Sequence, residues 1–257
     1  MIESIAKWLL ILILITSIIS IPATGVWLVY QPGEVCLGEN QIGNPGQVYI
    51  MSSIFTIMTI CCFSLRECNF NRRQKKQMNI TCVGTGAVLF VGTIYMAVYT
   101  LIQSTVGFAS LERQISQTER WMDIEHCLYK DKEVCAHLQH KYADDTRDQF
   151  VNRNFTHIQS GCCKPPVECN FNFSSPTVWI EPNNSTYSNS DCYKWDNDPK
   201  KLCYNCQICK LGFAQDVKKA WTISGAIVII SMLMTPVLAI LSIRVFSKEE
   251  SGYNELR

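Results

Sequence analysis

Apolar residues gather into four long stretches of this chain, and nearly all charged residues lie between them. The stretches cover residues 5–29, in which Lys7 is the one charge, and the uncharged runs 48–65, 78–102 and 221–243. A helix needs about 18 to 20 apolar residues to cross the ~30 Å hydrocarbon core of a bilayer. The pattern therefore predicts an all-α membrane protein with four transmembrane helices.

The first stretch has a second interpretation, a cleaved signal peptide. Residues 8–21 have the length of a signal-peptide core, and Ala23, Thr24 and Gly25 follow with the small side chains that suit cleavage. The apolar run continues through Val29, which favours a retained span.

The loop at 66–77 sets the orientation, because it carries five basic residues against one acidic residue. Short loops rich in Lys and Arg stay on the cytoplasmic side of a membrane. We therefore expect both termini in the cytosol. The resulting order is a cytosolic N-terminus with the first span (1–30), a small extracellular loop (31–47), the second span (48–65), the basic cytosolic loop (66–77), the third span (78–106), a large extracellular loop (107–220), the fourth span (221–243) and a cytosolic tail (244–257).

The large extracellular loop is dense in cysteine and in N-glycosylation sequons. Its nine cysteines are Cys127, Cys135, Cys162, Cys163, Cys169, Cys192, Cys203, Cys206 and Cys209. Its sequons begin at Asn154, Asn172, Asn183 and Asn184. Thiols oxidise outside the cell, and sequons there accept sugar. We therefore predict a disulfide-bonded, N-glycosylated ectodomain. The sequon at Asn79 lies at the cytoplasmic edge of the third span and should stay unmodified.

Nine cysteines cannot all pair within the large loop, because the number is odd. Cys36, in the small extracellular loop, is a tenth cysteine on the same side of the membrane. We expect it to bond to a cysteine of the large loop; an intermolecular disulfide through Cys36 is the alternative. Spacing alone does not reveal which cysteines pair.

Within the large loop, apolar periodicity predicts helices. One series, Phe108, Leu111, Ile115 and Met122, extends the third span; a second is Val134, Leu138 and Tyr142; a third, Ile208, Leu211, Val217 and Trp221, leads into the fourth span. Residues 170–200 are rich in Asn, Ser and Pro and are predicted to be irregular. We expect the loop to be mainly helical.

Candidate chemistry in the large loop is sparse. Cys203, Cys206 and Cys209 have the Cys-x-x-Cys spacing of some metal and iron–sulfur ligands, but the extracellular side favours disulfides. Asp144, Asp145 and Asp148 are interpreted as a solvated face. A net charge of +1 without a basic stripe argues against nucleic-acid binding. The histidines His126, His137, His140 and His157 occur without the His-Glu-x-x-His pattern of zinc proteases. The sequence predicts no enzyme activity, no metal and no cofactor.

On the cytoplasmic side, two kinds of modification or sorting site are indicated. Cysteines at or beside the membrane boundary are candidates for S-palmitoylation. They are Cys61, Cys62, Cys68 and Cys82; for Cys61 and Cys82, packing as small apolar side chains is the alternative. In the tail, Tyr253 to Leu256 fits a Tyr-x-x-apolar sorting signal for endosomal cycling, which adaptors would bind as an extended strand. A four-residue match also arises by chance.

Small side chains recur in the third span at Gly84, Gly86, Ala87, Gly92 and Ala97. Small residues let helices approach closely in lipid, so we predict that they form packing seams of a tight bundle. A polar path for a solute is the alternative. Such a path would need charges inside the membrane, and the uncharged stretches hold none.

The motif Gly161-Cys162-Cys163-Lys164-Pro165-Pro166, with Cys169 after it, opens a series of residues typical of one family. The series continues with Thr177-Val178-Trp179, Asp191-Cys192, Trp195-Asp196-Asn197-Asp198, Leu202-Cys203-Tyr204-x-Cys206, Cys209-Lys210 and Lys218-Lys219-x-Trp221. Together with the four-span layout, it resembles the tetraspanins, and most closely their plant branch. Animal tetraspanins read Cys-Cys-Gly where this chain has Gly-Cys-Cys.

This resemblance implies that Cys162 and Cys163 bond to cysteines before the last span. It also implies a scaffold that organises other tetraspanins and other membrane proteins laterally in the plasma membrane, as homo- or hetero-oligomers, with roles in cell differentiation and signalling. Two other functions stay open. One is a receptor that binds an extracellular ligand through residues 170–200; the other is a membrane thiol oxidoreductase with an exchangeable ectodomain disulfide.

Overall fold

The computed structural model describes residues 19, 23–37, 54, 84, 88, 91, 92, 94–183 and 186–255, with side chains of the last helix as far as Ile230 and at Leu233. It divides into two compact units. One, here called the span unit, comprises Met1–Val29, Asn44–Ile102 and Trp221–Arg257. The other, here called the head, comprises Tyr30–Gly43 and Gln103–Ala220. The head thus contains residues of both predicted extracellular loops.

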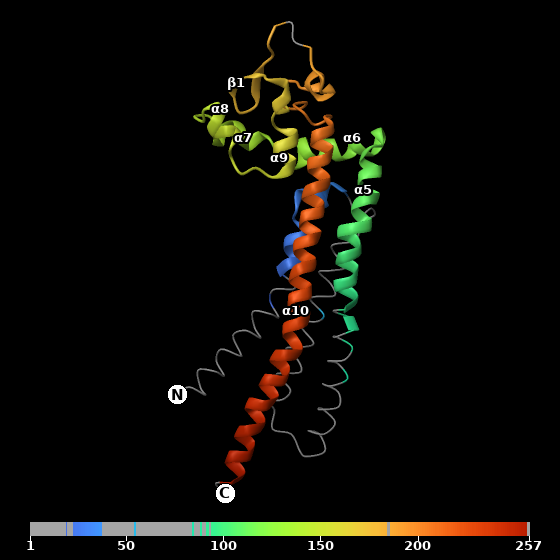
Figure 1. Ribbon diagram of the computed structural model, residues 1–257, viewed down its shortest axis with the longest axis vertical. Coiled ribbons are helices and arrows are strands. Elements are labelled where there is room, and N and C mark those ends of the chain that lie inside the picture. The colour runs from blue at the N-terminus through green and yellow to red at the C-terminus, as the bar shows by residue number, and fades with distance from the viewer. Residues whose placement is uncertain are drawn as a thin grey trace. The chain divides into compact units, whose positions relative to one another are not determined.

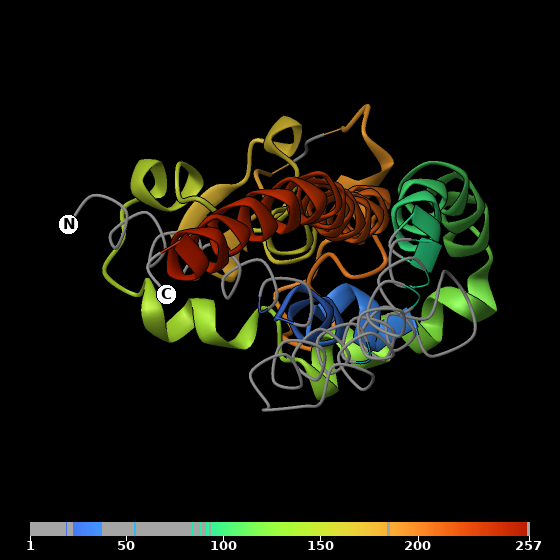
Figure 2. The same ribbon diagram turned by 90° about the horizontal axis from the view of Figure 1, so that it is seen from below.

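Two long helices contain the described residues of the third predicted span from Ile94 onward and those of the fourth. Among the described residues, one helix is long and apolar enough to cross a membrane, the 22 residues of Ile94–Ile115. The last helix, α10, runs without a break over Gln207–Glu255 and includes the residues of the predicted fourth span (Figure 1, Figure 2). Most residues of the first two predicted spans lie outside the described part of the chain.

Within the span unit, the third and fourth spans contact each other at Thr100. Its hydroxyl is fully buried and lies 3.0 Å from the carbonyl oxygens of Met96 and Ala97, to which it donates. A Cβ on Gly225 would lie 3.2 Å from the Thr100 Oγ1, so α10 fits here because Gly225 has no side chain. The ring of Tyr99 also meets Trp221 edge-on, with 5.9 Å between the ring centroids.

The helix that extends the third span ends earlier than the periodicity predicts. α5 covers Phe108–Ile115, and a separate helix, α6, covers Thr118–His126. Gln117 between them has an extended backbone with φ −78° and ψ 129°, which interrupts the helical period. The prediction that Met122 continues the apolar face of this helix was therefore wrong. Its side chain is 55% exposed, and Ile124 is buried instead.

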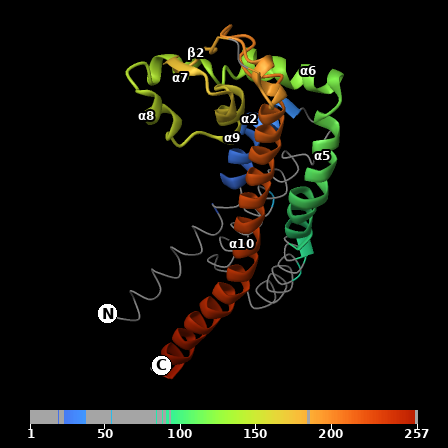
Figure 3. The same ribbon diagram turned by 45° about the horizontal axis from the view of Figure 1, so that its top comes forward.

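The described residues of the head form short helices and one hairpin around the first turns of α10 (Figure 3). Helices this short are not stable alone in water, so packing and covalent bonds must hold them. Besides α5 and α6, the helices are α2 (Pro32–Leu37), π-helical turns at Gln103–Gly107 and Cys127–Asp131, α7 (Ala136–Lys141), α8 (Arg147–Val151), α9 (His157–Cys162) and a 3-10 turn at Val167–Cys169. The second predicted helix is thus shorter than expected, because Val134 and Tyr142 lie outside α7.

The segment 170–200, predicted to be irregular, contains regular structure. Strands β1 (Asn172–Ser175) and β2 (Val178–Ile180) pair antiparallel, with Phe173 opposite Trp179. A 3-10 helix follows at Ser190–Lys194. The prediction failed because the strands are too short to show a clear alternation. Packing holds them: the two rings meet edge-on at 5.1 Å, and Trp179 belongs to a buried cluster with Phe150, Cys169, Phe171 and Cys192.

Helices α9 and α10 are in contact through their backbones. A Cβ on Gly161 would collide with the carbonyl of Ile208, and a Cβ on Gly212 would collide with the carbonyl of His157. The predicted face of α10 is only half confirmed: Val217 and Trp221 are buried, whereas Leu211 is 41% exposed. Ile208 is exposed as well, and the buried side chains here are Cys209, Phe213, Ala214, Val217 and Ala220. Glycines, rather than large apolar residues, decide which face of α10 meets α9.

Candidate functional site in the disulfide-bonded head

All ten cysteines predicted to form disulfides are paired in the head. The pairs are Cys36–Cys127, Cys135–Cys163, Cys162–Cys209, Cys169–Cys192 and Cys203–Cys206. Cys36 bonds within the same chain and joins α2 to the end of α6. Cys162 bonds to Cys209, which lies before the last span, as the resemblance implies.

Cys163 bonds in the other direction along the chain, to Cys135 on the N-terminal side of α9. Cys162 is the last residue of α9 and Cys163 is its C-cap, so their side chains leave the helix about 100° apart. One side chain therefore faces α10 and the other faces the start of α7. The two adjacent cysteines tie α9 to two different elements.

The Cys-x-x-Cys run forms neither a metal site nor an accessible redox pair. Cys203 and Cys206 are bonded to each other, and both have 0% exposure. Thiol–disulfide exchange needs a thiolate to reach a sulfur atom, which this burial prevents. Within the described residues, no cluster of three or more His, Cys, Asp or Glu side chains could hold a metal ion. Cys127 is half-buried, whereas the other nine disulfide-bonded cysteines are buried, so Cys36–Cys127 is the most exposed of the five pairs.

The carboxylate of Asp191 anchors the first turn of α10. One oxygen accepts from the Ile208 amide at 2.9 Å, and the other accepts from the Lys194 ammonium at 3.0 Å. Negative charge is favourable at the N-terminus of a helix. Burial raises the pKa of Asp191, but the backbone hydrogen bonds from Gln207 and Ile208, together with Lys194, outweigh it and lower that pKa below its ordinary value.

We expect Asp191→Asn to destabilise the head by about 2 kcal/mol at neutral pH, because a charged hydrogen-bond acceptor is lost. The depressed pKa of the folded state means that this stabilisation is complete above the ordinary value of 3.8 and is lost as the pH falls through the folded-state value. Stability measured by chemical denaturation from pH 7 down to about pH 3 should thus fall less in the variant than in the wild type. The control is Asp123→Asn, exposed on α6; an equal change in both variants would contradict the assignment.

A second acidic residue, Asp216 of α10, holds the start of α9. Its carboxylate accepts from the amides of His157 and Ile158 at 3.2 and 2.9 Å, and lies 2.6 Å from His157 Nδ1. Of the histidines considered for catalysis, His157 therefore serves to join two helices. Asp145, predicted to be solvated, instead forms an ion pair with Arg153 at 2.7 Å.

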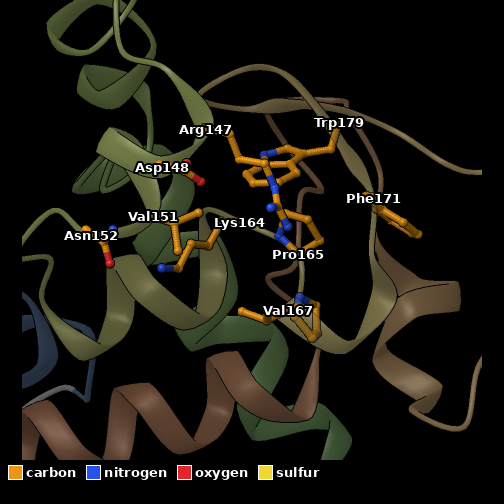
Figure 4. Close-up of a pocket in the computed structure, with 10 residues that line it drawn as sticks. Arg147, Asp148, Val151, Asn152, Lys164, Pro165, Val167, Phe171 and Trp179 are labelled. Atoms are coloured by element: carbon orange, nitrogen blue, oxygen red, sulfur yellow. The ribbon is translucent and has the colours of Figure 1, made fainter.

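A pocket opens between α8, the segment after α9 and the hairpin (Figure 4). It has a volume of about 140 Å³. Its walls are Arg147, Asp148, Val151 and Asn152 on one side, and Lys164, Pro165, Pro166, Val167, Phe171 and Trp179 on the other. The Lys-Pro-Pro part of the Gly-Cys-Cys motif thus forms one wall. Sequence reasoning used this motif only as a family signature, and no spacing signal pointed to a pocket.

The predicted modification sites lie partly within the described chain. The side chains of Asn154, Asn172 and Asn183 are exposed. Thr156, the third residue of the first sequon, also caps α9, since its hydroxyl accepts from the Gln159 amide at 3.1 Å. Tyr253 belongs to α10 in the chain alone, so an adaptor that binds it as an extended strand would have to unwind the end of this helix; the sorting signal stays a prediction. Asn79, Asn184, Leu256 and the cysteines Cys61, Cys62, Cys68 and Cys82 lie outside the described residues.

Comparison with known proteins agrees with this architecture. The model of the Tetraspanin family matches residues 5–248. The chain is 40% identical to Tetraspanin-8 of Arabidopsis thaliana over 111 residues, which are 43% of this chain and 40% of that protein. It is 38% identical to Tetraspanin-2 over 130 residues (50% and 47%), and 32% identical to Protein TORNADO 2 over 141 residues (55% and 51%), both from the same plant.

These matched regions span about half, or less, of the length of the curated relatives. No solved structure matches the chain significantly. Members of the family are four-span integral membrane proteins with a helical extracellular loop, and they are generally non-enzymatic scaffolds. Because the family model covers nearly the whole chain, and because these relatives are plant proteins, this chain belongs to the tetraspanin family and resembles its plant members.

Proposed function

We propose that this protein organises partner membrane proteins laterally, through the outward face of its third span. The observation that carries the proposal is a row of exposed apolar side chains at Val88, Val91, Tyr95, Val98 and Ile102, with exposed fractions of 72, 65, 55, 49 and 48%. Met96 and Ala97, on the opposite side of the helix, are buried. The exposed row therefore has its free side toward lipid or toward another helix.

The spacing of this row suits a helical partner. Its residues follow one another at intervals of three, four, three and four, which is the heptad pattern that two helices use when they cross at about 20°. Gly84, one step further along the same face, is also exposed. No described atom lies within 4 Å of a Cβ placed on Gly84 or Gly92. We therefore assign these two glycines to contacts with a partner, rather than to the seams within the bundle that their spacing suggested.

A photo-crosslinking residue in intact membranes tests the proposal. Placed at Val91 or Tyr95, it should capture partner proteins, because these side chains point outward. Placed at Met96, which is 7% exposed, it should capture none. Adducts of similar yield at positions 91 and 96, or adducts with lipid alone at position 91, would overturn the proposal.

Several further assignments belong with this function. We infer a plasma-membrane location with cytosolic termini, sugar on Asn154, Asn172 and either Asn183 or Asn184, and acylation at the cytoplasmic cysteines. The partners would include other tetraspanins, and the assemblies would act in cell differentiation and signalling. The thiol oxidoreductase is not proposed, because the Cys203–Cys206 pair is buried.

A further inference from the structure

We propose that the pocket between α8 and the Lys164–Val167 segment binds a small organic carboxylate whose apolar part is about the size of one ring. This site lies wholly in the head and does not depend on the lateral contacts proposed above. The carboxylate would occupy the end formed by Lys164 and Asn152. The apolar part would lie along Val151, Pro165 and Trp179.

The ammonium of Lys164 supplies the charge that such a ligand needs. Lys164 is half-buried, and burial lowers its pKa. Within the described residues it has no acidic partner; its recorded contact is with the ring of Phe155, 5.6 Å from the ring centroid. Some cations of the head do have carboxylate partners: Arg153 pairs with Asp145 and Lys194 with Asp191. A half-buried cation without a counter-ion would be stabilised by an incoming anion.

The remaining polar groups make the pocket a net cationic site. Arg147 and Asp148 stand at its rim, and both are exposed. With Lys164, the lining holds two basic side chains and one acidic side chain. In Figure 4 the Lys164 side chain extends toward Asn152, whose amide could donate to a bound carboxylate, whereas Arg147 extends toward Pro165.

The other walls are apolar and firmly held. Pro165 and Trp179 are buried, and the indole N–H of Trp179 already donates to the Pro176 carbonyl at 3.3 Å. The indole therefore offers only apolar ring surface to the pocket. The volume of about 140 Å³ is close to that of an engineered cavity of ~150 Å³ that accepts benzene. One ring, rather than a longer chain, therefore fits.

Binding to the full-length protein in detergent tests this inference, with benzoate as the probe and benzamide as its uncharged counterpart. Benzoate should quench or shift tryptophan fluorescence in a saturable manner, and benzamide should bind at least about tenfold more weakly. Lys164→Met should weaken benzoate binding by about tenfold or more, whereas Lys164→Arg should retain most of it. Lys200→Met, at an exposed lysine elsewhere in the head, should leave binding unchanged.

A third probe, N-acetylphenylalanine, distinguishes a peptide C-terminus from a free acid as the source of the carboxylate. Tighter binding of this probe than of benzoate would indicate a peptide end, and tighter binding of benzoate would indicate a free acid. Either result supports the site. Equal binding of benzoate and benzamide, or unchanged benzoate binding in Lys164→Met with a native circular dichroism spectrum, would overturn it.

Discussion

Replacing Cys36 by Ser should lower the free energy of unfolding of the head by about 4 to 5 kcal/mol, the largest single effect that we expect. The Cys36–Cys127 bond joins residues 91 positions apart. Without it, the unfolded chain is no longer closed into this long loop, so its conformational entropy rises and unfolding becomes more favourable. This bond is also the covalent link between α2 and the rest of the head. The measurement is chemical denaturation of the full-length protein in detergent, followed by tryptophan fluorescence.

Two further variants distinguish the loss of the Cys36–Cys127 disulfide from other effects of the Cys36→Ser substitution. Cys127→Ser should destabilise the head as much as Cys36→Ser does, and the double variant should be no less stable than either single variant, because all three lack the same bond. Each single variant leaves one unpaired thiol and should form some disulfide-linked dimer on a non-reducing gel; the double variant should not. A wild-type dimer that disappears in Cys36→Ser would instead indicate an intermolecular bond.

The second large effect is expected at Gly161. In Gly161→Ala the new Cβ would collide with the Ile208 carbonyl, which is backbone and cannot turn aside as a side chain can. Helices α9 and α10 must then separate, and the Cys162–Cys209 bond beside the contact resists that movement. We expect a loss of at least about 3 kcal/mol of stability and a clear fall in the amount of protein at the cell surface.

Gly92→Ala is the matched control for this prediction. It makes the same change in a helix, at a site where no described atom lies within 4 Å of the new Cβ. The head should keep its stability in that variant. Gly212→Ala, which places a Cβ against the His157 carbonyl, should behave like Gly161→Ala. If all three substitutions were tolerated equally, the close contact of α9 with α10 would be wrong.

The sequence by itself determined the features that depend on local composition. Uncharged stretches predict spans because burying a charge in hydrocarbon is costly wherever it lies in the chain. The odd number of cysteines in the large loop pointed to Cys36, since parity needs no knowledge of the fold. The Gly-Cys-Cys-Lys-Pro-Pro motif indicated the family, and the family model confirms that assignment.

Only the tertiary structure decided which residues meet across long distances. Cys163 pairs with Cys135 because α9 directs two neighbouring side chains to different elements, which spacing cannot show. The apolar period of α10 predicted Val217 and Trp221 as buried, but the close contact with Gly161 near the start of α10 cannot be read from that period.

The pocket depends on tertiary structure in the same way. It joins α8 to the Lys164–Val167 segment and to Trp179 of the hairpin, three parts of the chain that are separate in sequence. In the sequence alone, nothing distinguishes Lys164 from the other lysines of the chain. It becomes a candidate ligand-binding group because folding half-buries its ammonium and places no acidic partner from the described part of the chain beside it. A half-buried charge without a partner arises from the packing of the head and cannot be recognised in the sequence.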